Sequence, residues 1–319
     1  MSPFDYLITL RNPHSTHTIT AKNRIEQIKH TLHVKEVIDL ELHAGEGKTT
    51  DVLLDSCRNK LGPRTLLCIA GGDGTVNSVL KYLMTEKTSK TVQQTVLLPL
   101  WGGNANDLAH MLNGAAYKTA MADVLDKGQR VAIRPLCCEL TALSGERTTY
   151  IASSYIGFGA SAMAARRFNT LLHRNSKWHK VPGGRTIRET FTVLEAFVRI
   201  SAFHITENGK TTGIYERIYI NGSRIAKVRP LPLKLTDDAF YRLTIKEKRL
   251  RAVVMYLREL FRRPEAEQAS QEVSFVCEDR AWGQADGETF RVSAGTKVRI
   301  YRRKTPFYAL STRLPKTSS

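Results

Sequence analysis

The chain has 319 residues, of which 42% are hydrophobic and 8% aromatic, and its formal net charge at pH 7 is +18. This length is sufficient for two domains, and this apolar content excludes an intrinsically disordered chain. The charge is uneven, because residues 1–130 hold 15 Lys and Arg against 13 Asp and Glu, a net of +2, whereas the remainder holds 33 against 17, a net of +16.

A strongly basic second part implies an anionic partner, such as lipid head groups, nucleic acid or an acidic substrate, unless that surface is only a soluble basic one. The five cysteines are odd in number and contain no C-x-x-C pair, which favours reduced thiols and a cytoplasmic location. No apolar stretch reaches the roughly 18 residues that cross a bilayer. The N-terminus, with Asp5 near its start, does not resemble a signal peptide.

Strands and helices alternate along the first part. Apolar runs and amphipathic periodicity predict strands at 6–10, 34–42, 66–70 and 96–100, and helices at 19–32, 51–60, 75–84 and 107–112. This alternation predicts a parallel sheet with helices on its faces. Because ligands of such sheets bind beyond the carboxyl ends of the strands, the loops after Leu10, Ala70 and Leu100 are expected to share one site.

The segment between the third strand and its helix is Gly71-Gly72-Asp73-Gly74-Thr75. Glycines let backbone amides approach an anion closely, and the start of a helix adds free donors and a favourable dipole. A carboxylate beside bound phosphate would repel it unless a cation or a transferable proton lies between them, which indicates a magnesium nucleotide. The alternative is an ordinary tight turn with Asp73 as the helix N-cap.

The other two loops are also polar. Asn12-Pro13-His14-Ser15 follows the first strand, and Gly102-Gly103-Asn104-Ala105-Asn106-Asp107 follows the fourth. The second of these is also explained by a loop that ends in an Asp107 N-cap. Their placement at one end of the same sheet favours a binding role.

Short strand-like segments dominate the second part and predict an antiparallel sandwich or barrel, with strands at 131–133, 138–142, 149–153, 214–221, 241–245, 273–277, 289–292 and 297–301. Helical patterns interrupt them at 160–200 and 250–263. The second helical pattern has an apolar stripe flanked by arginines, which fits either a membrane-facing helix or a core-packed helix with a basic outer face. Asp286-Gly287 is a frequent two-residue hairpin turn.

Together these motifs resemble the diacylglycerol kinase catalytic-domain superfamily, which includes bacterial lipid kinases and sphingosine kinases, with NAD kinases as distant relatives. GGDGTVNSVL at 71–80 is similar to the family's GGDGT-x-N-E-V, and LPLWGGNANDLAHML at 98–112 is similar to its PLGTxNDFAR block. ADGE at 285–288 and NPHS at 12–15 are similar to its late DGE and its early NP-x-S-G.

The resemblance implies a Rossmann-like α/β domain that binds ATP at 1–130 and an antiparallel β-sandwich domain for a lipid substrate at 131–300. Residues 301–319 would return to the first domain. The implied activity is phosphorylation of a lipid hydroxyl with ATP and Mg²⁺, by an enzyme that is cytoplasmic and peripherally associated with an anionic membrane surface.

Position by position, the resemblance assigns nucleotide contacts to nine residues of the first domain: Asn12, Gly71, Gly72, Gly74, Thr75, Gly103, Asn104, Asn106 and Asp107. Asp73 and Asp107 would organise the catalytic magnesium. Asp286 would be the general base that takes the proton of the lipid hydroxyl, with Glu288 beside it. Interdomain closure would then be part of catalysis.

The sequence departs from the family pattern at Ser78, Thr16 and Trp101-Gly102, which bears on the nucleotide contacts. Asp237 and Asp238 resemble a segment that holds a structural magnesium in some bacterial members, but Ala239 replaces its glycine. Basic residues expected at the membrane are Arg166, Arg167, Arg174, Lys177, Lys180, Arg185 and Arg188.

Three other functions compete with the lipid kinase. An inactive nucleotide-binding regulator would fit the substitutions. An NAD kinase should carry a TPTGSTAY-like segment, which Ser153-Ser154-Tyr155-Ile156-Gly157 does not match. A nucleic-acid binder would explain the charge, but the basic runs form no known RNA or DNA module, so no nucleic-acid partner is expected.

Overall fold

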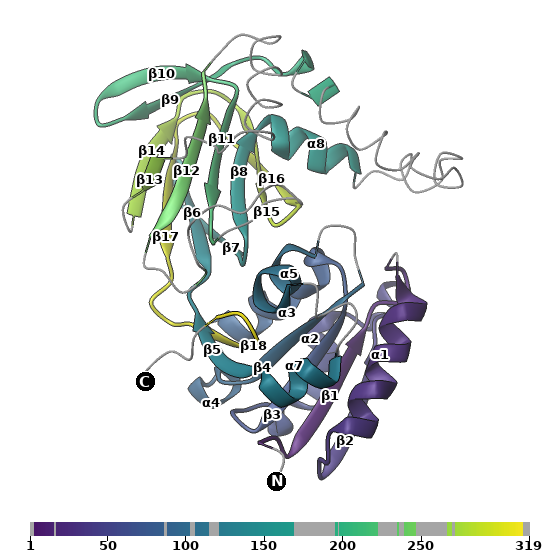
Figure 1. Ribbon diagram of the computed structural model, residues 1–319. Coiled ribbons are helices and arrows are strands. Elements are labelled where there is room, and N and C mark those ends of the chain that lie inside the picture. Colours follow the sequence, from purple (N-terminus) through teal and green to yellow (C-terminus); the bar gives the residue numbers. More distant parts are fainter. Residues whose placement is uncertain are drawn as a thin grey trace. The chain divides into compact units, whose positions relative to one another are not determined.

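The computed structural model describes residues 3–15, 17–85, 88–102, 106–114, 121–168, 195–196, 198–222, 235, 239–246, 267–269 and 272–314. They fall into two compact units (Figure 1). The first unit comprises Met1–Pro135, Lys234–Thr236 and Arg303–Ser319, and the second comprises Leu136–Leu233 and Asp237–Arg302.

The first unit is an α/β layer structure with a six-stranded sheet in the order β2-β1-β3-β4-β18-β5. Its strands are β1 (Tyr6–Arg11), β2 (Glu36–Glu41), β3 (Thr65–Gly71), β4 (Val96–Trp101), β5 (Gln129–Ile133) and β18 (Phe307–Ser311). Its helices are α1 (Thr18–Thr31), α2 (Thr50–Ser56), α3 (Asp73–Met84), α4 (Lys90–Gln93), α5 (Asp107–Asn113) and α7 (Met121–Lys127), with 3-10 turns η1 (Ala44–Glu46) and η2 (Arg58–Lys60).

Burial explains the order of this sheet. Every residue of β3 is buried, as its continuous apolar run predicts for a central parallel strand, whereas β2 is half exposed at the edge. β18, from the end of the chain, pairs parallel with β4 and antiparallel with β5. The strand expected at 131–133 therefore lies in this sheet and not among the sandwich strands.

The second unit contains two antiparallel six-stranded sheets, in the orders β10-β9-β14-β17-β6-β7 and β13-β12-β11-β8-β15-β16. The strands of the first of these sheets are β6 (Leu136–Thr141), β7 (Arg147–Ala152), β9 (Phe203–Glu207), β10 (Lys210–Ile214), β14 (Glu272–Cys277) and β17 (Thr296–Arg302). Those of the second are β8 (Tyr155–Gly159), β11 (Glu216–Ile220), β12 (Phe240–Ile245), β13 (Glu267–Ala269), β15 (Ala281–Ala285) and β16 (Glu288–Val292). Helix α8 (Ala160–Phe168) follows β8.

A single aromatic-rich core joins the two sheets of the second unit. Phe158 of β8 makes edge-to-face contacts with Tyr219, Phe275 and Phe290, with ring centroids 5.5 to 6.4 Å apart. Such pairs stabilise a core beyond their burial alone. The predicted sandwich is confirmed, while the helix expected at 250–263 lies outside the described residues.

In the described part of the chain, no helix is both long enough and apolar enough to span a bilayer.

Candidate active site

The turn between β3 and α3 is shaped by its glycines. Gly71 lies so close to Thr75 that an added Cβ would stand 2.5 Å from the Thr75 Oγ1. Gly74 is exposed, and a Cβ there would meet open space. The first turn of α3 is therefore open at Gly74, while the Thr75 amide in the same turn donates to the Gly72 carbonyl at 2.9 Å.

Helix α3 begins at Asp73, with Gly72 as its N-cap in an extended conformation. The alternative reading of Asp73 as the N-cap is therefore wrong. The same holds for Asp107, which is the first residue of α5 behind the N-cap Asn106. Both aspartates thus lie in the first helical turn, where the helix dipole favours negative charge.

The Asp73 carboxylate joins the starts of the two helices. Its Oδ2 accepts a hydrogen bond from the Asn106 amide at 3.0 Å, and its Oδ1 accepts one from the Asp107 amide at 3.1 Å. Asn106 has a left-handed backbone with φ of 52°, which turns these two amides toward Asp73. Asp73 therefore fixes the loop after β4 against the loop after β3.

The loop after β1 reaches the same cluster. The Asn12 Nδ2 donates to the Thr75 Oγ1 at 3.1 Å, and the Asn12 amide donates to the Ala70 carbonyl at 2.9 Å. Gly102 packs on the backbone of Gly71, since an added Cβ would lie 2.6 Å from the Gly71 nitrogen. The structure thus brings the three loops together, while Gly103 and Asn104 lie outside the described residues.

Asp286 and Gly287 form the two-residue turn of the hairpin β15–β16, with φ of 47° and 87°. The Asp286 side chain points into the second unit, and the residue is 5% exposed. Its carboxylate accepts hydrogen bonds from the amides of Ser153, Ser154 and Tyr155, at 2.6 to 3.1 Å, and from the Ser153 hydroxyl at 2.8 Å. It therefore holds the connection between β7 and β8.

Burial raises the pKa of Asp286 to about 6, against the hydrogen bonds from Tyr155 and Ser153, which lower it. Both carboxylate oxygens are occupied by donors. Glu288, the first residue of β16, is exposed. The two carboxylates of this hairpin therefore differ in access: Asp286 is enclosed and Glu288 faces solvent.

Asn221 also binds the connection between β7 and β8, which contains Ser153 and Ser154 and is called the serine connection below. The Asn221 amide donates to the Ser154 carbonyl at 2.7 Å, and its Nδ2 donates to the Ser153 carbonyl at 2.8 Å. The Asn221 Oδ1 in turn accepts from the Arg302 Nε at 3.0 Å. Sequence reasoning missed Asn221 and Arg302, and the signal for Ser153-Ser154 was a polar pair at the end of a predicted strand.

Phosphate fits the site formed by the loops after β1, β3 and β4, because the start of α3 offers a backbone donor with open space at Gly74. The described residues contain no cluster of three or more Asp, Glu, His or Cys side chains placed so that they could hold a metal ion by themselves. Mg²⁺ is commonly held by one or two carboxylates together with phosphate and water, so Asp73 remains a suitable ligand. Asp237 and Asp238 lie outside the described residues.

Comparison with known proteins shows which family and which solved structures the chain is similar to. Residues 6–137 match the family model of the diacylglycerol kinase catalytic domain. A solved diacylglycerol kinase from Bacillus anthracis is similar over 98% of this chain and 99% of its own, with a TM-score of 0.67 and 15% identity. Yeast NADH kinase complexed with NADH is similar over 98% of this chain and 84% of its own, with a TM-score of 0.54 and 13% identity.

None of the curated proteins matches the sequence. At such low sequence identity, the structural similarity shows a shared fold. This confirms the predicted combination of an α/β domain and a β domain. The family match over residues 6–137 confirms the resemblance proposed from the motifs.

Proposed function

We propose that this chain, whose residues 6–137 belong to the diacylglycerol kinase catalytic-domain family, is an ATP-dependent lipid kinase. It transfers the γ-phosphate of ATP to a hydroxyl of a membrane lipid, such as a diacylglycerol or a sphingosine-like alcohol. The observation that carries the proposal is the position of Asp73, whose carboxylate joins the starts of α3 and α5 beside an open glycine turn.

In this proposal the nucleotide phosphates bind at the start of α3, against the Gly74 amide, with Asn12 holding the Thr75 hydroxyl. Asp73 binds Mg²⁺ together with phosphate oxygens and water. When bound, the magnesium ion offsets the negative charge of the phosphates. Phosphoryl transfer depends mainly on such positioning and charge stabilisation, and little on covalent chemistry by the protein.

The reaction forms a bond between the lipid hydroxyl oxygen and the γ-phosphorus, breaks the bond from that phosphorus to the β,γ-bridging oxygen, and releases ADP. The hydroxyl proton must pass to a base. The resemblance implies this role for Asp286, but its carboxylate is buried and accepts hydrogen bonds from three amides and a hydroxyl. We therefore propose Glu288 as the proton acceptor and Asp286 as the residue that positions the hairpin.

Association with an anionic membrane surface is part of the same proposal. Among the described residues, the Arg166 guanidinium lies 4.3 Å from the centroid of the Trp282 ring, and that of Arg291 lies 5.0 Å from it. Each cation near an anionic leaflet contributes roughly 1 kcal/mol of attraction, and an aromatic ring suits the interface. Sedimentation with phosphatidylglycerol vesicles should fall as salt rises, and salt-independent binding would contradict this part.

Two alternatives remain as outcomes of the test. An inactive nucleotide-binding regulator is suggested by Ser78, whose hydroxyl donates to the Gly74 carbonyl at 3.0 Å where the family has glutamate. An NAD kinase is suggested by the similarity to yeast NADH kinase. The segment Ser153–Gly157 argues against it, because it lacks the expected motif.

The deciding experiment measures transfer of labelled γ-phosphate from ATP, with Mg²⁺, to a panel of lipid alcohols in mixed micelles, with NAD and water as control acceptors. Labelling of one lipid class, abolished by Asp73→Ala, supports the lipid kinase. Labelling of NAD alone selects the NAD kinase. ATP binding without any transfer selects the inactive regulator.

A further inference from the structure

One end of the sandwich carries charged side chains where strand alternation calls for apolar ones. Phe203 and Ile205 of β9 are buried in the core, and Glu207 is the next residue on the same face. Arg217 likewise precedes the core residue Tyr219 by two positions on β11. Since successive side chains of a strand alternate between faces, these charges point inward.

Arg242 follows the same rule on β12, two positions after the core residue Phe240. Lys210 of β10 shares a face with Thr212 and the buried Ile214. The turn that joins β9 to β10 is Asn208-Gly209, with φ of 51° and 74°, a tight hairpin that keeps Glu207 and Lys210 side by side. Four charged residues from four strands therefore converge.

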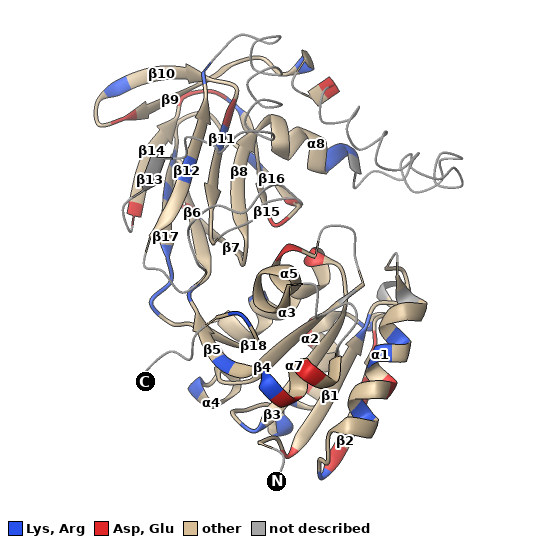
Figure 2. Cartoon of the chain, viewed as in Figure 1, with Lys and Arg blue, Asp and Glu red and all other residues tan. Residues whose placement is uncertain are grey.

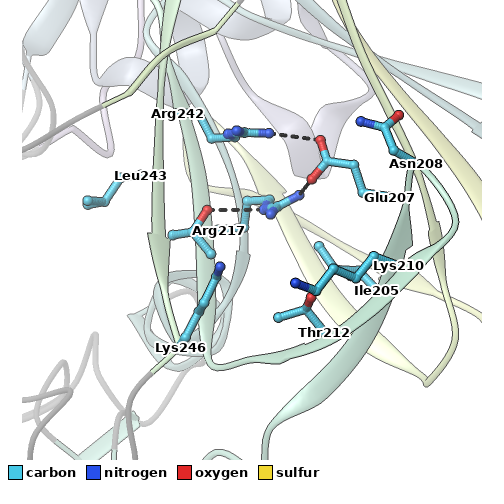
Figure 3. Close-up of a pocket in the computed structure, with 10 residues that line it drawn as sticks. Ile205, Glu207, Asn208, Lys210, Thr212, Arg217, Arg242, Leu243 and Lys246 are labelled. Atoms are coloured by element: carbon cyan, nitrogen blue, oxygen red, sulfur yellow. Dashed lines mark hydrogen bonds and ion pairs between the residues drawn. The ribbon is translucent and has the colours of Figure 1, made fainter.

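A single carboxylate serves two guanidinium groups there. The Glu207 Oε2 accepts from the Arg217 Nη1 at 2.8 Å, and its Oε1 accepts from the Arg242 Nη1 at 2.8 Å (Figure 3). The Arg217 Nε also donates to the Thr244 Oγ1 at 3.2 Å, and only 6% of the Arg217 side chain is exposed. Burying a cation is costly unless nearby negative charge offsets it, and Glu207 supplies negative charge to both guanidinium groups.

These groups line a cavity of about 570 Å³, a size that suits a small molecule. Lys210 and Lys246 also line it (Figure 3), and neither makes an ion pair with any described residue. The basic positions on β10 and β12 are visible in Figure 2. Among the described residues that line it, two arginines and two lysines against one glutamate give a net charge of +3.

We propose that this cavity is an anion site that binds a phosphate group. Guanidinium forks match the tetrahedral oxygens of phosphate, and the two lysines supply further donors. The bound anion would offset the positive charge of Lys210 and Lys246. The site is separate from the Asp286 cluster, because Arg217 and Asn221 are four residues apart along β11, or about 13 Å. The proposal therefore does not depend on the kinase reaction.

The test is a calorimetric titration of the full chain with inorganic pyrophosphate. The variant Lys210→Gln/Lys246→Gln removes two cavity cations that bond to no described residue, so it should fold. The matched control Lys297→Gln/Lys304→Gln makes the same charge change at two exposed positions outside the cavity. We expect affinity to fall at least tenfold in the cavity variant and less than twofold in the control.

Pyrophosphate bound at the glycine turn of the first unit would contribute equally to all three proteins, so the difference reports on the cavity alone. Thermal unfolding gives a second readout: pyrophosphate should raise the midpoint of the wild type and the control more than that of the cavity variant. Equal affinities and equal midpoint shifts in the cavity variant and the control would overturn the proposal.

The phosphate group could belong to a soluble molecule or to a lipid head group. Sedimentation with phosphatidylglycerol vesicles, against phosphatidylcholine vesicles as baseline, separates these sources. A loss of pyrophosphate binding alone in the cavity variant supports a soluble phosphate compound, and a loss of vesicle binding beyond that of the control supports a lipid head group. No loss in either assay rejects the site.

Discussion

Asp73 of the first unit and Asp286 of the second each begin an Asp-Gly pair, and each carboxylate accepts hydrogen bonds from consecutive backbone amides. They differ in access to water. Asp73 is half-buried next to the exposed Gly74, whereas Asp286 is 5% exposed and enclosed by a serine connection. The same local chemistry therefore occurs in a partly exposed turn, which we propose binds nucleotide, in the first unit, and in a buried hairpin that is hydrogen-bonded to Ser153–Tyr155 in the second.

The comparison predicts that substitution of Asp73 mainly lowers activity, whereas substitution of Asp286 mainly lowers stability. The largest effect is expected for Asp73→Ala, because it removes the carboxylate from the proposed phosphate and metal site. Lipid phosphorylation should fall by about 10³-fold, comparable to the loss of one dominant electrostatic group from an active site. The measurement is the initial rate of γ-phosphate transfer from ATP.

Asp73→Ala should also cost some stability, since the two amides that lose their acceptor belong to the buried residues Asn106 and Asp107. We expect a loss of about 1 kcal/mol in urea unfolding. An active Asp73→Ala protein would contradict the role of Asp73. A protein that no longer folds would contradict the distinction between the two aspartates.

The second unit should also be the more sensitive to pH. Burial raises the pKa of Glu216 to about 8, although hydrogen bonds from Ser161 lower it. Between about pH 4.5, the ordinary value, and pH 8, the folded chain keeps a proton that the unfolded chain has lost. The stabilisation is therefore complete below pH 4.5 and is lost as the pH rises to 8.

Urea unfolding of the wild type and of Glu216→Gln at pH 5 and pH 8 checks this sign. The wild type should lose on the order of 3 kcal/mol more than the variant over this interval. Asp286, whose pKa is raised to about 6, should cause a smaller loss of the same sign that both proteins share. Parallel pH profiles would show that Glu216 does not titrate in this range.

In Asp286→Ala, by contrast with Asp73→Ala, the main expected effect is a loss of stability. It leaves three amides and a buried hydroxyl without their acceptor, but it also removes a buried charge, so the net loss should be about 2 kcal/mol at pH 7. Glu288→Gln, at an exposed position, should unfold like the wild type while phosphoryl transfer falls.

If Asp286→Asn loses more phosphoryl transfer than Glu288→Gln without loss of stability, Asp286 and not Glu288 is the base. The pair of conservative variants therefore decides between the two carboxylates of the hairpin. The folded fraction of each protein, measured by circular dichroism at the assay temperature, is needed for the comparison.

The sequence predicted the elements whose pattern is local and long. The strand at 66–70 and the helix at 19–32 are confirmed by β3 and α1 within one residue at each of the four boundaries, because burial on both faces and helical periodicity leave clear signals. The helix after β3 begins two residues earlier than predicted, since Gly72 takes the capping position.

Pairings between distant segments could not be read from the pattern. Strand β18 enters the first sheet from the end of the chain, an arrangement that only the resemblance implied. The Asn208-Gly209 hairpin carried a recognisable turn signal that was overlooked. The groups that donate hydrogen bonds to Asp286, and the convergence of Arg217 with Arg242, depend on register across strands, which a single sequence does not specify.

The smallest effect, and the sharpest probe of access at the glycine turn, is expected for Gly74→Ala. An added Cβ there would meet open space within the protein, and its backbone does not have a positive φ, so the fold should be unchanged. The methyl group would occupy space where a phosphate oxygen approaches the amide. We expect the KM for ATP to rise about tenfold, a change of about 1.4 kcal/mol, with an unchanged unfolding midpoint.

Gly45→Ala is the matched control, because a Cβ at Gly45 also meets open space but lies in η1, outside the three loops. It should leave both the KM for ATP and the unfolding midpoint as in the wild type. If Gly74→Ala behaves like Gly45→Ala, the nucleotide does not approach the start of α3. Asp73 would then have the same role as Asp286: it would hold loops together through hydrogen bonds and would take no part in binding.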